Sequence, residues 1–169
     1  MPKLKISLSV IIVSLISISC MKFYKIKENE NGELLINKKA NYSFNKIPDT
    51  NDLKLIDTSA IYVQIPQGRF YNEDEKKYFN VLKFHSDGFY KKEFLDITTK
   101  TRTKESILYG GKWRIENNLL ELQSFYPSSG GKTNYYHRLV SKAIIKNGKL
   151  YFSIGPLDHS VYEKRIDKK

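Results

Sequence analysis

The residue types that most often carry catalysis are sparse in this sequence and form no known catalytic or metal-binding pattern. Its three histidines, His85, His137 and His159, show neither a His-x-x-x-His spacing nor a Cys-plus-His spacing. No Gly-x-Ser-x-Gly motif presents a nucleophilic serine, and Gly130-Gly131-Lys132 lacks the other residues of a phosphate-binding loop. We therefore expect no cofactor, no metal and no enzymatic activity. A hydrolase is the less favoured alternative, because paired carboxylates can meet in space without any sequence pattern.

The only cysteine, Cys20, directly follows a segment with the layout of a secretory signal peptide. Lys3 and Lys5 supply its positive charge, and residues 6–18 are uncharged and broken only by serines. A transmembrane helix needs about 20 apolar residues, so this shorter stretch predicts cleavage rather than a membrane-spanning anchor. A lone cysteine in an exported chain has no disulfide partner, which leaves a reactive, an intermolecular or a modified thiol.

Ile18-Ser19-Cys20 resembles the lipobox of bacterial lipoproteins, in which the cysteine becomes the first mature residue and carries the lipid. Ser17 departs from that motif, where an aliphatic residue is usual, but looser boxes of this kind are found in Bacteroidota-type lipoproteins. The resemblance implies lipid attachment at Cys20 and a place on the cell outer membrane, facing the periplasm or the exterior. The alternative is an ordinary secretory signal cut nearby, with Cys20 left as a free thiol.

Removing residues 1–19 as a signal peptide would take away two lysines and lower the net charge from +11 to +9. In a cell envelope, a basic surface would meet phospholipid head groups, an amphiphile or acidic glycans, and nucleic acid is not an expected partner. A solvated lysine-rich surface is the simpler interpretation. The remaining chain has the size of one domain, which we expect to be monomeric.

Residues 20–52 are rich in Asn, Lys and Glu and show no sustained hydrophobic periodicity. Such a composition buries little apolar surface, so it predicts a lipidated N-terminus followed by a flexible tether. Residues 33–36 could alternatively add an edge strand or a small turn.

Residues 53–169 instead alternate short segments rich in Ile, Val, Phe and Tyr with turn residues, which predicts an all-β sandwich or barrel without a competing helix. The candidate strands are Ile61–Ile65, Tyr78–His85, Phe89–Leu95, Lys112–Glu116, Leu119–Phe125, Asn134–Lys146, Lys149–Ile154 and Ser160–Arg165.

Asparagine and glycine pairs mark tight turns and fix the register of the strands beside them. Two-residue turns at Asn147-Gly148 and Asn117-Asn118 would keep one face of each hairpin apolar. The predicted pairs are Ile145 with Leu150, Ala143 with Phe152, Ile115 with Leu120, Trp113 with Leu122, and Arg114 with Glu121. A two-residue turn at Asp87-Gly88 would place Leu82 opposite Glu93, so we expect a bulge or a longer loop there.

Longer connections at residues 72–77, 96–111 and 127–132 are places where binding residues could sit. The last of these is flanked by Tyr126, Tyr135, Tyr136 and Arg138, which could form an aromatic, basic rim that stacks on sugars or holds an amphiphile. Packing in the barrel wall is the alternative role for these residues.

Three segments, at residues 57–62, 82–90 and 111–119, resemble the small lipocalin-like lipoproteins of Bacteroidota, and the likeness extends from near Asp57 to near Lys164. It implies a single antiparallel up-and-down β-barrel, or barrel-like meander, of about eight strands. Gly111-Lys112-Trp113 departs from true lipocalins, where Gly-x-Trp lies on the first barrel strand, so their ligand binding is not carried over.

An eight-stranded barrel can be filled by side chains or can hold one small ligand. We therefore expect a non-catalytic module that binds a small apolar or amphiphilic ligand. The alternative is an envelope protein- or glycan-interaction module without an internal ligand.

Overall fold

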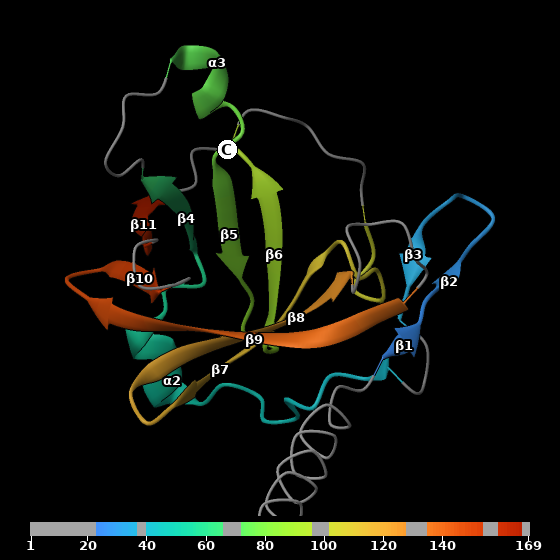
Figure 1. Ribbon diagram of the computed structural model, residues 1–169. Coiled ribbons are helices and arrows are strands. Elements are labelled where there is room, and N and C mark those ends of the chain that lie inside the picture. Colours follow the sequence, from blue (N-terminus) through green and yellow to red (C-terminus); the bar gives the residue numbers. More distant parts are fainter. Residues whose placement is uncertain are drawn as a thin grey trace, which may run out of the picture.

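Eight antiparallel strands close into a barrel in the computed structural model, which describes residues 23–36, 40–65, 72–95, 102–127, 135–153 and 159–166 (Figure 1). Each strand pairs with the next along the chain, and the last pairs with the first. The strands are β4 (Ala60–Ile65), β5 (Asn80–Phe84), β6 (Phe89–Phe94), β7 (Gly110–Glu116), β8 (Leu119–Pro127), β9 (Tyr135–Lys146), β10 (Lys149–Ser153) and β11 (His159–Ile166). The predicted all-β fold, a single up-and-down barrel of eight strands, is confirmed.

Tight turns hold the hairpins in the predicted registers. Asn117, Asn118 and Asn147 have φ values of 51°, 61° and 51°, as type I′ turns require. The structure confirms the pairs Ile145 with Leu150, Ala143 with Phe152, Ile115 with Leu120, Trp113 with Leu122, and Arg114 with Glu121. Between β5 and β6 the loop spans residues 85–88, longer than two residues as predicted, and this loop places Leu82 opposite Lys92.

The two ends of the barrel differ. The closed end carries the tight turns and helix α2 (Thr50–Leu55), which directly precedes β4. The open end is formed by the last residues of β4, β6, β8 and β10 and the first residues of β5, β7, β9 and β11, and all three predicted long connections join strands there. Helix α3 (Glu73–Lys76) lies at this open end, in the upper part of Figure 1, whereas α2 lies in its lower part.

Neither short helix was expected from the sequence, because a helix of so few residues shows no hydrophobic periodicity. Capping interactions define both instead. The Asp49 carboxylate accepts hydrogen bonds from the backbone N–H groups of Asn51 and Asp52 at the start of α2. Asn72 caps α3 in the same way. Among the described residues, no helix is both long and apolar enough to cross a membrane.

The main core fills the closed half of the barrel. Trp113, Phe84, Leu120 and Leu150 are fully buried there, and Ile56 packs against them from the end of α2. The Trp113 indole donates a hydrogen bond to the His85 carbonyl oxygen at 3.0 Å. Each large apolar side chain buried in this way contributes roughly 1.5–3 kcal/mol to stability.

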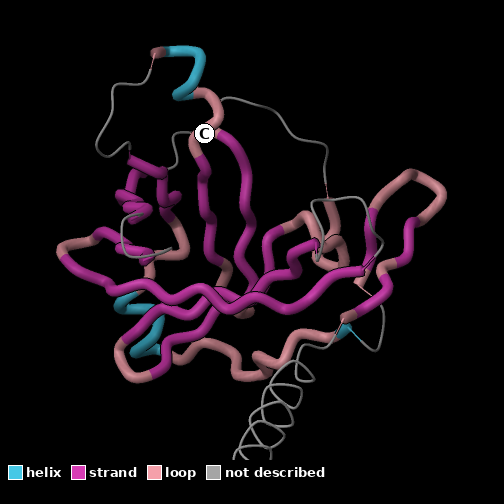
Figure 2. Tube along the Cα trace, viewed as in Figure 1, coloured by secondary structure: helices cyan, strands magenta, loops and turns pink. Residues whose placement is uncertain are grey.

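The segment expected to be a tether packs against the outside of the barrel over residues 23–36 and 40–52. Strand β1 (Tyr24–Lys25) pairs with the start of β9, and β2 (Lys27–Glu28) forms a hairpin with β3 (Leu34–Leu35), so residues 33–36 do add a strand (Figure 2). A second apolar cluster joins this segment to the barrel wall, and its buried members are Ile26, Ala40, Ile107 and Phe125. Isolated apolar residues, without any period, supply this burial.

Candidate functional site

A cavity of about 500 Å³ occupies the open half of the barrel. Most of its lining is apolar, and every barrel strand except β4 contributes described residues to it. The inward-facing apolar and aromatic residues include Leu82, Tyr90, Phe94, Leu122, Phe152 and Tyr162. The barrel is therefore hollow in its open half and filled in its closed half.

Small serine side chains face the cavity opposite larger apolar ones. Ser141 lies opposite Leu122 across β8 and β9, and Ser160 lies opposite Phe152 across β10 and β11. Ser124 also lines the cavity. One layer further towards the closed end, Ala143 lies opposite Leu120 and Tyr162 lies opposite Leu150, and both leucines are fully buried. Serines on three strands thus face the open half of the barrel beside larger apolar residues.

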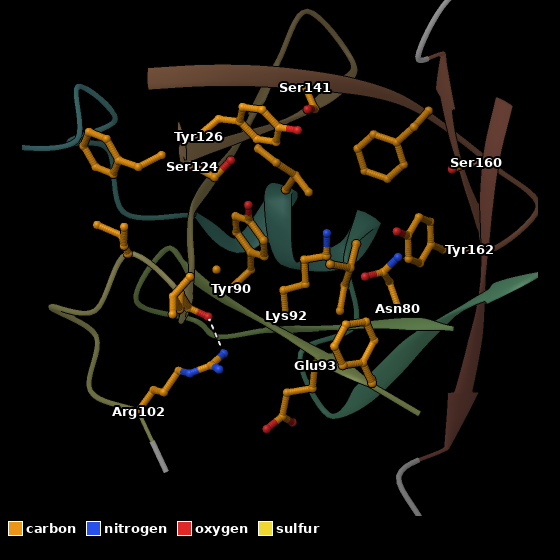
Figure 3. A pocket seen from close by; sticks show the side chains of 18 of the residues that line it. Asn80, Tyr90, Lys92, Glu93, Arg102, Ser124, Tyr126, Ser141, Ser160 and Tyr162 are labelled. Atoms are coloured by element: carbon orange, nitrogen blue, oxygen red, sulfur yellow. Dashed lines mark hydrogen bonds between the residues drawn. The ribbon is translucent and has the colours of Figure 1, made fainter. Parts of the chain in front are cut away.

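Lys92 is the exception among the inward-facing residues of β6. Tyr90 and Phe94, which share its face of the strand, are aromatic, and its cross-strand partner Leu82 is only 3% exposed. Figure 3 shows the Lys92 side chain pointing into the cavity. In the part of the chain that the structure describes, its amine has neither an ion-pair nor a hydrogen-bond partner.

The cavity wall lowers the pKa of Lys92 below that of an ordinary lysine, because the surrounding protein displaces water from the charged amine. The side chain is nonetheless exposed, since the cavity opens to solvent, so its amine is only partly desolvated. Partial loss of hydration raises the free energy of the charged amine. An anion brought into the cavity would offset this cost by pairing with it.

Two other charged residues line the cavity at its edge. Glu93 follows Lys92 on β6, so its side chain starts from the outer face of the barrel, where it forms an ion pair with Lys91. Arg102 donates a hydrogen bond to the Leu108 carbonyl oxygen at 3.0 Å. Figure 3 shows Glu93 and Arg102 extending away from the amine of Lys92. Neither residue neutralises Lys92.

The tyrosines of the cavity are neutral hydrogen-bonding groups. Burial raises the pKa of Tyr162 to about 12. Burial also raises the pKa of Tyr90, against the opposing effect of its hydrogen bond with Ser124. Because both phenols keep their protons at neutral pH, they can donate hydrogen bonds to a ligand but cannot supply a negative charge to Lys92.

The four residues of the predicted aromatic rim are divided between two faces of the sheet. Tyr126 lines the outer part of the cavity, and Tyr135 lies exposed at the start of β9. Tyr136 packs into the second apolar cluster on the outer wall. The Arg138 guanidinium lies 5.4 Å from the centre of the Tyr24 ring and donates to the Asn41 carbonyl oxygen at 3.3 Å. The structure therefore places only Tyr126 of the predicted set in the cavity.

The two histidines with described side chains, His85 and His137, lie apart from each other, and neither lines the cavity. The His85 Nε2 atom and the Tyr109 hydroxyl are 3.0 Å apart on the outer surface, and His137 lies between the Phe23 and Tyr126 rings. The side chain of His159 is not described. Within the described ranges, no group of three or more His, Cys, Asp or Glu residues could hold a metal ion. Cys20, the predicted lipid-attachment residue, lies outside the described residues.

Comparisons with protein-family models, with curated proteins and with solved structures found no match. Functional inference therefore rests on the cavity and on the residues that line it.

Proposed function

We propose that this protein is a non-catalytic, lipid-anchored binding protein of the outer membrane that holds a small amphiphilic ligand inside its barrel. The cavity is the observation that carries this proposal. Its volume of about 500 Å³ lies within the range of roughly 300–1,000 Å³ typical of small-molecule sites, and its lining combines a mostly apolar wall with a few polar groups.

The apolar part of such a ligand would pack against Leu82, Leu122 and Phe152, which form the boundary between the cavity and the filled half of the barrel. Each methylene group removed from water gains ~0.8 kcal/mol, so a chain that buries about six of them gains on the order of 5 kcal/mol. The hydroxyls of Ser124, Ser141 and Ser160 and the phenols of Tyr90 and Tyr162 are placed to bind a polar group.

Attachment of a lipid to Cys20 would hold the barrel close to the bilayer. Phe23, three residues further along the chain, already contacts His137, with 6.4 Å between the ring centres. Three residues span roughly 10 Å at most. The barrel would thus be held directly at the membrane surface, where amphiphiles are abundant, rather than at the end of a long tether.

Native mass spectrometry tests the proposal on a chain that begins at Met21 and is exported to a bacterial periplasm. This chain retains every described helix and strand, since all of them lie between Phe23 and Ile166. We expect a co-purified amphiphile that is released on denaturation. An empty protein that also fails to take up added amphiphiles would contradict the proposal and favour an interaction module without an internal ligand.

A pair of variants locates the ligand. Ser141→Phe fills the cavity, whereas Val140→Phe introduces the same side chain one residue earlier on the outer face of β9, where Val140 is exposed. The proposal predicts that the ligand is lost from the first variant and retained by the second. Retention by both would place the ligand elsewhere.

A further inference from the structure

We infer that the ligand is an amphiphile with a singly charged anionic head, and that Lys92 holds this head inside the barrel. The inference rests on the proposed function, because it requires a ligand in the cavity. It goes further by naming the chemical class of that ligand and the residue that selects it.

An ammonium group is costly to place in an apolar cavity unless an opposite charge accompanies it. Among the described cavity residues, the one carboxylate is that of Glu93, which forms an ion pair with Lys91 on the outer side of the sheet. The phenols of Tyr90 and Tyr162 keep their protons and supply no charge. An anionic ligand group would therefore provide the counter-charge that the described protein does not.

The position of Lys92 places the head group within the barrel. Along β6, Lys92 lies between Tyr90, which is buried in the core, and Phe94, which is exposed near the open end. Figure 3 shows the amine between the labelled side chains of Tyr90 and Tyr162. Ser141 and Ser160 line the same cavity with hydroxyl groups that can donate to the oxygens of an acid.

The single charge of Lys92 matches one negative charge better than two. A carboxylate would be neutralised by one ammonium group, whereas a phosphate monoester would keep an excess negative charge in an apolar setting. Arg102 lies at the cavity edge with its guanidinium bonded to the Leu108 carbonyl oxygen, so it does not provide a second charge beside Lys92. We therefore expect a carboxylate with an apolar chain.

Calorimetric titration with three ligands of equal chain length tests this inference: dodecanoate, dodecanol and dodecyl phosphate. The wild-type chain from Met21 should bind dodecanoate at least tenfold more tightly than the other two, a difference of about 1.4 kcal/mol, because only dodecanoate brings a single negative charge to Lys92. Lys92→Met should lose this preference and bind dodecanoate and dodecanol alike. Lys83→Met is the matched control, because Lys83 lies on the outer face of the neighbouring strand β5, and it should keep the wild-type preference.

The outcomes separate the two proposals. If the wild type binds none of the three ligands, the proposed function fails. If it binds the acid and the alcohol equally, the cavity binds ligands but the role of Lys92 is wrong. A Lys92→Met variant that keeps the acid preference also overturns the inference, and a Lys92→Gln variant provides the same comparison should the methionine variant fail to fold.

Discussion

Leu82 and Lys92 lie directly opposite each other on β5 and β6, and both line the cavity inside the barrel. Cross-strand pairs on an interior face are normally apolar on both sides, as Trp113 and Leu122 are one hairpin further along. A charged residue in such a pair departs from the pattern that stabilises the fold. Departures of this kind are found preferentially at functional sites, and here the departure coincides with the hollow half of the barrel.

Replacing Lys92 by methionine should make the protein more stable at neutral pH. The variant removes a partly desolvated charge while keeping the length of the side chain, and we expect a gain of roughly 0.5–1 kcal/mol in the free energy of unfolding, a modest value because the amine still contacts solvent. Urea denaturation of both proteins at pH 7 measures it. A clear loss of stability would show that Lys92 supports the fold and not a ligand.

The same experiment at higher pH checks the cause. The pKa of Lys92 is lower in the folded than in the unfolded protein, so the destabilising effect of its charge is complete below the folded pKa. It shrinks as the pH rises and disappears above the unfolded value of about 10.4. The difference between variant and wild type should therefore narrow towards pH 10.

Glu121 should stabilise the barrel through its two ion pairs. Its side chain is 5% exposed on β8, with Arg114 Nη2 and Lys142 Nζ each 2.7 Å from a carboxylate oxygen. Burial by itself raises the pKa of Glu121, but the hydrogen bonds from Lys142 and Arg114 outweigh it, and the pKa is lowered overall. Glu121→Gln should cost about 1–3 kcal/mol at pH 7.

Acid should remove this difference. A carboxylate with a lowered pKa stabilises the folded state fully above its unfolded value of about 4.3 and loses that effect as the pH falls through the folded value. Unfolding of the wild type and Glu121→Gln at pH 7 and pH 3 gives the comparison. An equal difference at both values would mean that the ion pairs contribute nothing.

Gly111 allows β7 and β8 to approach closely. A Cβ atom at this position would lie 1.9 Å from the Gln123 carbonyl oxygen, so Gly111→Ala should cost about 3 kcal/mol or more because backbone atoms must move apart. Gly148→Ala is the control, since nothing lies within 4 Å of its Cβ position and the cost there comes from its positive φ alone, about 1 kcal/mol. Thermal unfolding compares the stability of the two variants. Equal losses of stability would contradict the close approach of β7 and β8 at Gly111.

Gln123 should hold the N-terminal segment on the barrel. Its side-chain oxygen accepts from the Ser43 backbone N–H at 2.7 Å, and its side-chain nitrogen donates to the Ser43 hydroxyl at 2.7 Å. Gln123→Ala should speed amide hydrogen exchange at Ser43 and Phe44, because their N–H groups lose their acceptor. The free energy of the opening that exposes these amides should fall by about 1–2 kcal/mol. Exchange at Leu120 and Leu150 should stay slow. Unchanged protection at Ser43 would show that other contacts hold the segment.

The barrel itself could be predicted because its signals are local. Short alternating segments between turn residues predicted all eight strands to within two residues of their observed ends, and the turns at Asn117-Asn118 and Asn147-Gly148 fixed two registers. The N-terminal segment could not be predicted in this way. Its buried residues, such as Ile26 and Phe44, are separated by polar ones and gain their burial from a wall that only the folded barrel provides.

The lining of the cavity could not be predicted from the sequence for a related reason. The inward position of Lys92 follows from the four-residue loop after Phe84, and the sequence indicated only that this loop exceeds two residues. The predicted rim failed to assemble because adjacent residues of a strand point to opposite faces, which separates Tyr136 from Tyr135. The small volume of Ser141 and Ser160 becomes informative only when both are known to face the same interior.

The ionisation of a bound ligand tests the central claim most directly. Dodecanoate labelled with ¹³C at the carboxyl carbon reports its own charge by NMR when titrated with acid in the complex. An ammonium group beside the carboxylate favours the charged form, so the pKa of the bound acid should lie below that of a free alkyl carboxylic acid in the wild type. In Lys92→Met, where only the apolar wall acts, the pKa of the bound acid should lie above that of the free acid. The same titration midpoint in both proteins would contradict the assignment of Lys92 as the residue that binds the anion.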